Sequence, residues 1–112
     1  MDQSNYEAVC FEIISCAGTA KSCFLEAIEA AKSGEDYATL IKEGTDAFEQ
    51  ASKAHFKALQ METNNELPTG LLLIHAETIL CSAETIRDLS STIIELINKY
   101  HIETQEELAE YL

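Results

Sequence analysis

Residues 71–100 read LLLIHAETILCSAETIRDLSSTIIELINKY, and this stretch decides the class of fold. Small and apolar side chains recur in it in steps of four and three residues, at Leu72, Ala76, Ile79, Ala83, Ile86, Ser90, Ile93, Ile97 and Tyr100. Steps of this size place side chains in one stripe along a helix. A strand would need alternation with a period of two residues, which the stretch lacks. Residues 71–100 are therefore predicted to form one long amphipathic helix.

The same spacing occurs twice more, earlier in the chain. The first segment carries it at Tyr6, Cys10, Ile13, Ala17, Ala20, Phe24, Ala27 and Ala31, and the second at Tyr37, Ile41, Gly44, Phe48, Ala51, His55 and Ala58. Helix-breaking residues separate the segments, at Gly34 and in the stretch 64–70, which contains Pro68. We predict an all-α protein, an antiparallel three-helix bundle that forms a single domain over residues 1–112.

Two further predictions concern the third helix. After Tyr100 the stripe ends, and Thr104 with Glu107 has the spacing of a capping box, which predicts a separate short helix at the C-terminal end. The third helix is also apolar over more than one stripe. Such a helix either fills a core between two neighbours or also packs in a symmetric oligomer, and we favour the oligomer.

The charge of the chain limits its partners. Twenty acidic residues against seven basic ones give a formal net charge of −13. So few basic residues cannot neutralise a run of phosphates, which argues against nucleic acid and against an anionic membrane surface. Partners that are charged are expected to be basic.

Compartment and cofactors follow from the cysteines and the N-terminus. No segment approaches the roughly 20 apolar residues of a membrane-spanning helix, and the acidic N-terminus is unlike a secretory signal. The four cysteines include no Cys-x-x-Cys pair. We therefore expect reduced, core-filling thiols in a cytoplasmic protein with no metal site and no cofactor.

The three histidines are the candidate chemical residues. His101 follows the third predicted helix and is expected to be exposed to solvent, and His55 occupies a core position on the second helix. His75 stands in the most apolar stretch of the chain, where burial without a partner would cost a few kcal/mol. Its residue type and position leave two readings open, a hydrogen-bonded core residue or a reactive group.

Residues 71–80, LLLIHAETIL, carry a resemblance to a known family. They are similar to the active-site segment of the lactose/cellobiose-type enzyme IIA of the bacterial sugar phosphotransferase system, where apolar residues precede His-Ala-Gln-Asp-His-Leu-Met. Residues 11–20 resemble the first helix of that family, residues 27–35 its first turn, and Ala54-His55 a pair on its second helix. The resemblance extends over nearly the whole chain.

The resemblance implies a homotrimer of three-helix bundles and a phosphocarrier function. His75 would accept a phosphoryl group from the phosphocarrier protein HPr and pass it to a sugar-specific IIB component, and through it to the IIC membrane permease. An apolar setting around His75 would favour the neutral, nucleophilic imidazole and would exclude water.

Three departures from the family pattern follow His75. Glu77, Thr78 and Ile79 stand where the family has glutamine, aspartate and histidine. The aspartate usually contributes to a metal site on the trimer axis, and a neutral threonine cannot replace a carboxylate there. We therefore predict no metal, and we keep the alternative of a divergent, non-catalytic or regulatory helical interaction protein.

Overall fold

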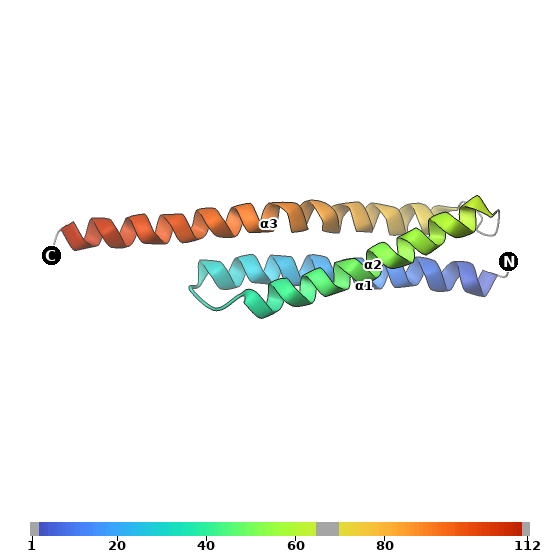
Figure 1. Ribbon diagram of the computed structural model, residues 1–112, viewed down its shortest axis with the longest axis horizontal. Coiled ribbons are helices and arrows are strands. Elements are labelled where there is room, and N and C mark those ends of the chain that lie inside the picture. Colours follow the sequence, from blue (N-terminus) through green and yellow to red (C-terminus); the bar gives the residue numbers. More distant parts are fainter. Residues whose placement is uncertain (1–2, 65–69, 111–112) are drawn as a thin grey trace.

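A computed structural model describes residues 3–64 and 70–110, and it confirms the all-α, antiparallel three-helix bundle (Figure 1). The helices are α1, Gln3–Lys32; α2, Ala38–Thr63; and α3, Leu71–Glu110. The molecule is elongated, with extents of 71 × 18 × 17 Å. Helix α1 packs extensively against both α2 and α3, whereas α2 and α3 meet over a smaller area. Helix α1 is therefore the central element of the bundle.

The turn between α1 and α2 is built around Gly34, as the sequence predicts. Gly34 has a φ of +72°, a conformation that a residue without Cβ adopts at little cost. The N–H of Gly34 donates to the carbonyl of Ala31 at 3.1 Å, and the N–H of Glu35 donates to that of Ala30 at 2.9 Å. These two bonds are the Schellman pattern that ends a helix. Asp36 then accepts a hydrogen bond from the N–H of Ala38 at 3.1 Å, so it caps α2 from outside rather than forming its first turn.

The separate C-terminal helix is the part of the fold prediction that is wrong. Helix α3 runs without interruption to Glu110, through Thr104 and Glu107, and it continues past the turn that joins α1 and α2 (Figure 1). The sequence has no glycine or proline between Leu71 and Glu110, so nothing stops the helix once it has formed. Pro68, in the predicted helix-breaking stretch before α3, lies outside the described residues.

The core forms along the predicted stripes. Its fully or almost fully buried members are Tyr6, Val9, Cys10, Ile13, Ala17, Ala20, Phe24, Phe48, Ala51, Ala54, Ala58, Leu73, Ala76, Leu80 and Ala83, with a second cluster at Ala27, Ala31 and Ile94. Many of these residues are alanines, which let the helix axes approach closely. Helix α2 approaches α1 closely at Gly44, where an added Cβ would lie 3.0 Å from the Phe24 ring.

The cysteines match the sequence prediction in part. All four are free thiols, but only Cys10 and Cys23 fill the core, while Cys16 is half-buried and Cys81 is exposed. Burial is the main cause that raises the pKa of the Cys10, Cys16 and Cys23 thiols above the ordinary value. A raised pKa leaves less of the reactive thiolate at neutral pH, so these three thiols are weak nucleophiles.

Helix α1 also corrects the expectation that no segment is apolar enough to cross a membrane. By length and composition alone, Ser4–Lys32 meets that description. The same description fits a central core helix, and one side of α1 lines the core against both neighbouring helices.

A tyrosine of α1 fixes the start of α3. The first N–H groups of a helix have no partner within the helix. Here the N–H of Leu73 donates to the hydroxyl oxygen of Tyr6 at 3.3 Å, and both groups are buried. Gly70 makes room for this contact, since a Cβ at that position would lie 2.8 Å from the Tyr6 hydroxyl. The contact joins segments that are 67 residues apart in the sequence.

The two glycines inside helices give a matched pair for a test of the packing. A Cβ at Gly18 would meet nothing within 4 Å, whereas at Gly44 it would press on Phe24 and Cys23. Gly18→Ala is expected to raise the free energy of unfolding by about 0.5–1 kcal/mol, the helix propensity gain. Gly44→Ala is expected to lower it by roughly 1–3 kcal/mol through overpacking. Urea unfolding at one protein concentration measures both, and equal effects would contradict the α1–α2 contact.

The Tyr6 contact is tested by Tyr6→Phe, which removes only the hydroxyl. We expect a loss of about 1–2 kcal/mol in the free energy of unfolding, because the buried N–H of Leu73 loses its acceptor. Hydrogen exchange should be faster at the Leu73 amide. Tyr37→Phe is the control, because it removes a hydrogen bond to Asn98 elsewhere in the bundle. Unchanged exchange at Leu73 in Tyr6→Phe would show that the hydroxyl does not hold the start of α3.

Candidate functional site

The side of α3 that points away from α1 carries no charged side chain over most of its length. Successive helical residues are rotated by about 100°, so the side opposite the buried residues Leu73, Ala76 and Ala83 can be read from the sequence. We call it the outward face, and it consists of Leu71, Ile74, His75, Thr78, Cys81, Ser82, Thr85, Leu89, Thr92, Ile93 and Leu96. All are exposed except Ser82, which is half-buried.

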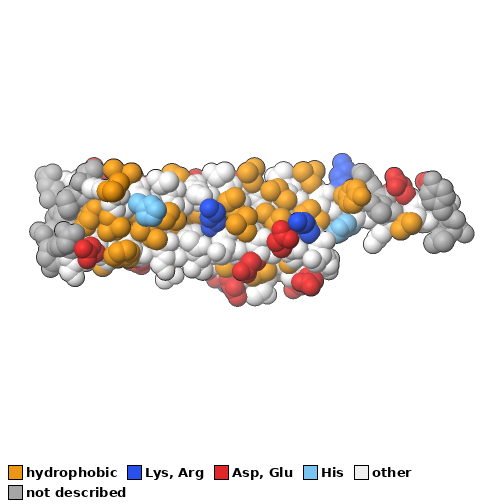
Figure 2. Space-filling view, turned by 180° about the vertical axis from the view of Figure 1, so that it is seen from behind, with side chains coloured by type: hydrophobic (Ala, Val, Ile, Leu, Met, Phe, Trp, Pro, Cys, Tyr) orange, Lys and Arg blue, Asp and Glu red, His pale blue; other side chains and the backbone are white. Residues whose placement is uncertain are grey.

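The charged residues of this part of α3 lie off the outward face. They are Glu77, Glu84, Arg87, Asp88 and Glu95. In a chain with 24% charged residues, such an uncharged face is unusual. The space-filling view shows hydrophobic side chains along the length of the molecule, with histidine side chains exposed among them (Figure 2).

His75 lies at the edge of the outward face and is exposed, not buried. The sequence-based expectation of an apolar environment that excludes water is therefore wrong for the protomer. The physical reason is the helical rotation: in residues 71–76, Leu73 and Ala76 are buried and Leu72 packs partly buried against the core, whereas Leu71 and Ile74 are 82% and 53% exposed. These two exposed apolar side chains form the surface next to the imidazole.

His75 is positioned by the segment that holds it. The helix begins four residues before it, at Leu71, where the Tyr6 hydroxyl binds the first turn. One turn after His75, the hydroxyl of Thr78 donates to the carbonyl of Ile74 at 2.9 Å. Backbone and capping contacts thus fix the direction in which the imidazole leaves the helix.

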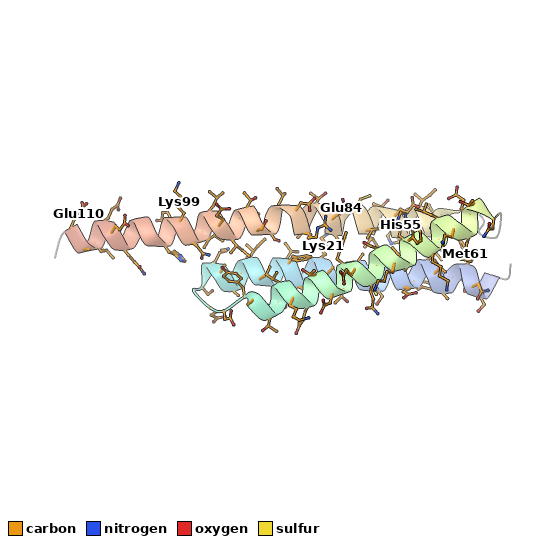
Figure 3. All side chains as sticks on the ribbon, viewed as in Figure 1. Lys21, His55, Met61, Glu84, Lys99 and Glu110 are labelled. Atoms are coloured by element: carbon orange, nitrogen blue, oxygen red, sulfur yellow. The ribbon has the colours of Figure 1, made fainter. Side chains whose placement is uncertain are left out.

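The other side of this segment is tied to α2. Nε2 of His55 lies 3.3 Å from a carboxylate oxygen of Glu77, and the two side chains are 29% and 44% exposed. Figure 3 labels His55 on α2, near the part of α2 that lies alongside α3. His55 therefore has a hydrogen-bonding partner, as expected, but it is partly exposed at the edge of the core. Sequence reasoning did not find its pairing with Glu77, because the spacing of residues on different helices does not reveal their partners.

Two more polar contacts join α3 to α2 and to Tyr37, the residue before α2. The Arg87 guanidinium lies 4.3 Å from the centre of the Phe48 ring, and the Asn98 amide donates to the Tyr37 hydroxyl at 2.9 Å. Together with His55–Glu77 they are spaced along the contact between these helices. They keep α2 from sliding along α3 where the apolar contact is small.

The third histidine differs from its prediction. His101 lies within α3 and is half-buried, rather than following the helix as an exposed residue. Its ring is tilted by 54° to that of Tyr100, with the ring centres 6.3 Å apart.

The described residues of one protomer contain no group of three metal-ligand side chains that could hold an ion. A hollow of about 850 Å³ is lined by Tyr37, Ile41, Ser91, Ile94, Glu95, Asn98, Lys99 and Glu106. His75 is not among these residues, and it precedes Ser91 by about 24 Å along the helix axis. His75 is exposed to solvent, so a group transferred to this imidazole arrives at an open surface.

Comparisons with known proteins place this geometry in a family. Residues 8–98 match the model of the family described as the lactose/cellobiose-specific IIA subunit of the phosphotransferase system. The lichenan-specific phosphotransferase enzyme IIA component of Bacillus subtilis is 40% identical over 97 residues, which are 83% of this chain and 87% of that protein. The lactose-specific EIIA component of Staphylococcus epidermidis is 33% identical over 102 residues, 88% of this chain and 98% of that protein.

A solved structure agrees with the sequence matches. The crystal structure of the cellobiose-specific enzyme IIA from Bacillus anthracis superposes with a TM-score of 0.83, covers 91% of this chain and 94% of that one, and is 28% identical in sequence. The family model, the relatives and the fold agree with the resemblance found around His75. The chain belongs to the lactose/cellobiose-specific IIA family of the phosphotransferase system.

Proposed function

We propose that this protein is a phosphocarrier that accepts a phosphoryl group from phospho-HPr on His75 and passes it to a sugar-specific IIB component. The IIB component would serve the IIC permease during uptake of a lactose-, cellobiose- or chitobiose-type sugar. The observation that carries the proposal is the exposed position of His75 on α3, next to the exposed side chains of Leu71 and Ile74. A phosphoryl donor that is itself a protein can reach such a surface, whereas a small-molecule enzyme needs a cleft.

The chemistry requires a neutral imidazole. One ring nitrogen uses its lone pair to attack phosphorus, and a P–N bond forms while the bond between phosphorus and the donor breaks. The transferred group then leaves in the same way to the IIB component. Exposure of His75 lets both partners reach it in turn, and exclusion of water during transfer falls to the docked partner rather than to this protomer.

The surroundings of His75 suit brief docking to other proteins. Leu71 and Ile74 offer exposed apolar contacts next to the imidazole. The net charge of −13 favours partners with a basic rim and increases the rate of encounter with them. A phosphocarrier that exchanges with HPr works in the cytoplasm, which is where we place this protein.

We also propose a homotrimer that is formed through the outward face of α3. The face exposes Leu89, Ile93 and Leu96, and apolar patches of this length usually mark an interaction surface. The absence of charge on it means that copies of an acidic protein can approach there without direct repulsion. His75 lies at the edge of the face, so a neighbouring copy would border the phosphorylation site.

The sequence around His75 also supports a second candidate function. Glu77, Thr78 and Ile79 depart from the family pattern, and Glu77 contacts His55. A regulatory or non-catalytic interaction protein of the same fold would use α3 only for assembly. Phosphorylation separates the two functions.

Phosphoryl transfer is tested by incubating the protein with phosphoenolpyruvate, enzyme I and HPr. We expect an acid-labile phosphate on the wild type that falls to background in His75→Ala and stays in His55→Ala and His101→Ala. An unlabelled wild type with several bacterial HPr proteins would rule out the phosphocarrier. Label that survives in His75→Ala would rule out only the site.

Assembly is tested by one charge placed on the outward face. Leu89→Glu is expected to turn the trimer into a monomer, because each interface would bury a carboxylate. Phe56→Glu is the matched control on α2, since Phe56 is 61% and Leu89 50% exposed. Light scattering after size exclusion measures the molar mass. If only the Phe56→Glu variant dissociated, the interface would lie on α2 and not on α3.

A further inference from the structure

We infer that the trimer assembles without a divalent cation on its axis, and that internally bonded hydroxyl groups replace the metal site that the family resemblance implies. The inference rests on the proposed homotrimer. It concerns the part of the outward face around Thr78, which is the position where the resemblance expects a metal-binding aspartate.

The side chain at that position does not fit a metal. A hard divalent cation is held by carboxylates and other oxygen donors whose charge offsets its own. Thr78 is neutral, and although its hydroxyl donates to the carbonyl of Ile74 at 2.9 Å, the side chain supplies no negative charge to offset that of a cation. The other metal-ligand residues of the outward face are His75 and Cys81, which offer nitrogen and sulfur donors rather than the oxygen donors that a hard divalent cation prefers.

The same internal bonding recurs two turns along the face. The hydroxyl of Thr85 donates to the carbonyl of Cys81 at 3.1 Å. A threonine bonded in this way has no unsatisfied donor, and it presents its methyl group to a neighbour. Burying Thr78 and Thr85 between copies therefore leaves no donor without a partner.

The electrostatic consequence is that the interface has no need of a cation. Three carboxylates brought together on an axis would repel one another, and a bound cation would be required to offset that repulsion. The outward face carries none, since the charged residues of this part of α3 lie to the side. Apolar contacts of Leu71, Leu89 and Leu96 can then hold the copies together unaided.

The experiment measures the molar mass and metal content of the full chain in EDTA and in Mg²⁺. The wild type is expected at three times the protomer mass of 12.4 kDa in both buffers, with no stoichiometric metal by elemental analysis. Thr78→Val, which removes the hydroxyl but keeps the shape, should remain a trimer in both. Thr78→Asp should weaken association at least tenfold in EDTA and recover in Mg²⁺.

Thr63→Asp is the matched control. Thr63 is also exposed, and its hydroxyl also donates to a carbonyl four residues earlier, that of Leu59 at 3.0 Å, but it lies on α2. The Thr63→Asp variant should leave association unchanged in both buffers. An effect equal to that of Thr78→Asp would overturn the inference. A wild type that dissociates in EDTA, or that retains metal in stoichiometric amount, would overturn it as well. A monomer in both buffers would overturn the assembly and this inference together, while phosphorylation of His75 on the same samples would still test the phosphocarrier separately.

Discussion

Close packing along the small-residue stripe of α1 is the constraint on which the rest of the structure depends. Ala17, Ala20 and Ala27 have no exposed surface, because α2 and α3 both pack directly on this helix. With α1 in the centre, α3 can bury only the side that faces it. The direction of every other side chain on α3 is then set by helical rotation. That includes His75, which the rotation leaves on the surface.

The contacts around the start of α3 hold the segment that carries His75 in a defined position. The Tyr6 hydroxyl binds the first turn, and Glu77 contacts His55 on α2, so the segment that carries His75 is fixed from two sides. The position of the exposed imidazole is therefore set by the helical segment that carries it. A rigid support with an open surface suits a group that must meet two protein partners in succession.

The surface near His75 is the part of the chain that differs from the family pattern on which the resemblance rests. The family match spans residues 8–98 and the superposition covers 91% of the chain, while Glu77, Thr78 and Ile79 differ from the pattern on which the resemblance around His75 rests. Thr78 is a neutral residue of the outward face, and Glu77 is directed at His55 on α2. Both side chains lie outside the buried core, so the fold does not depend on their charge.

The sequence by itself determined the helices, the Gly34 turn and His75 as the candidate, because local periodicity and chain breakers act within a few residues. It could not determine the uninterrupted course of α3, where the capping signal at Thr104 competed with the absence of any breaker. Only the tertiary structure decided that His75 is exposed, that Glu77 meets His55, and that Gly44 but not Gly18 is a close contact. These facts depend on which side of each helix faces its neighbour, and the relative rotation of packed helices is set by contacts between residues far apart in the chain.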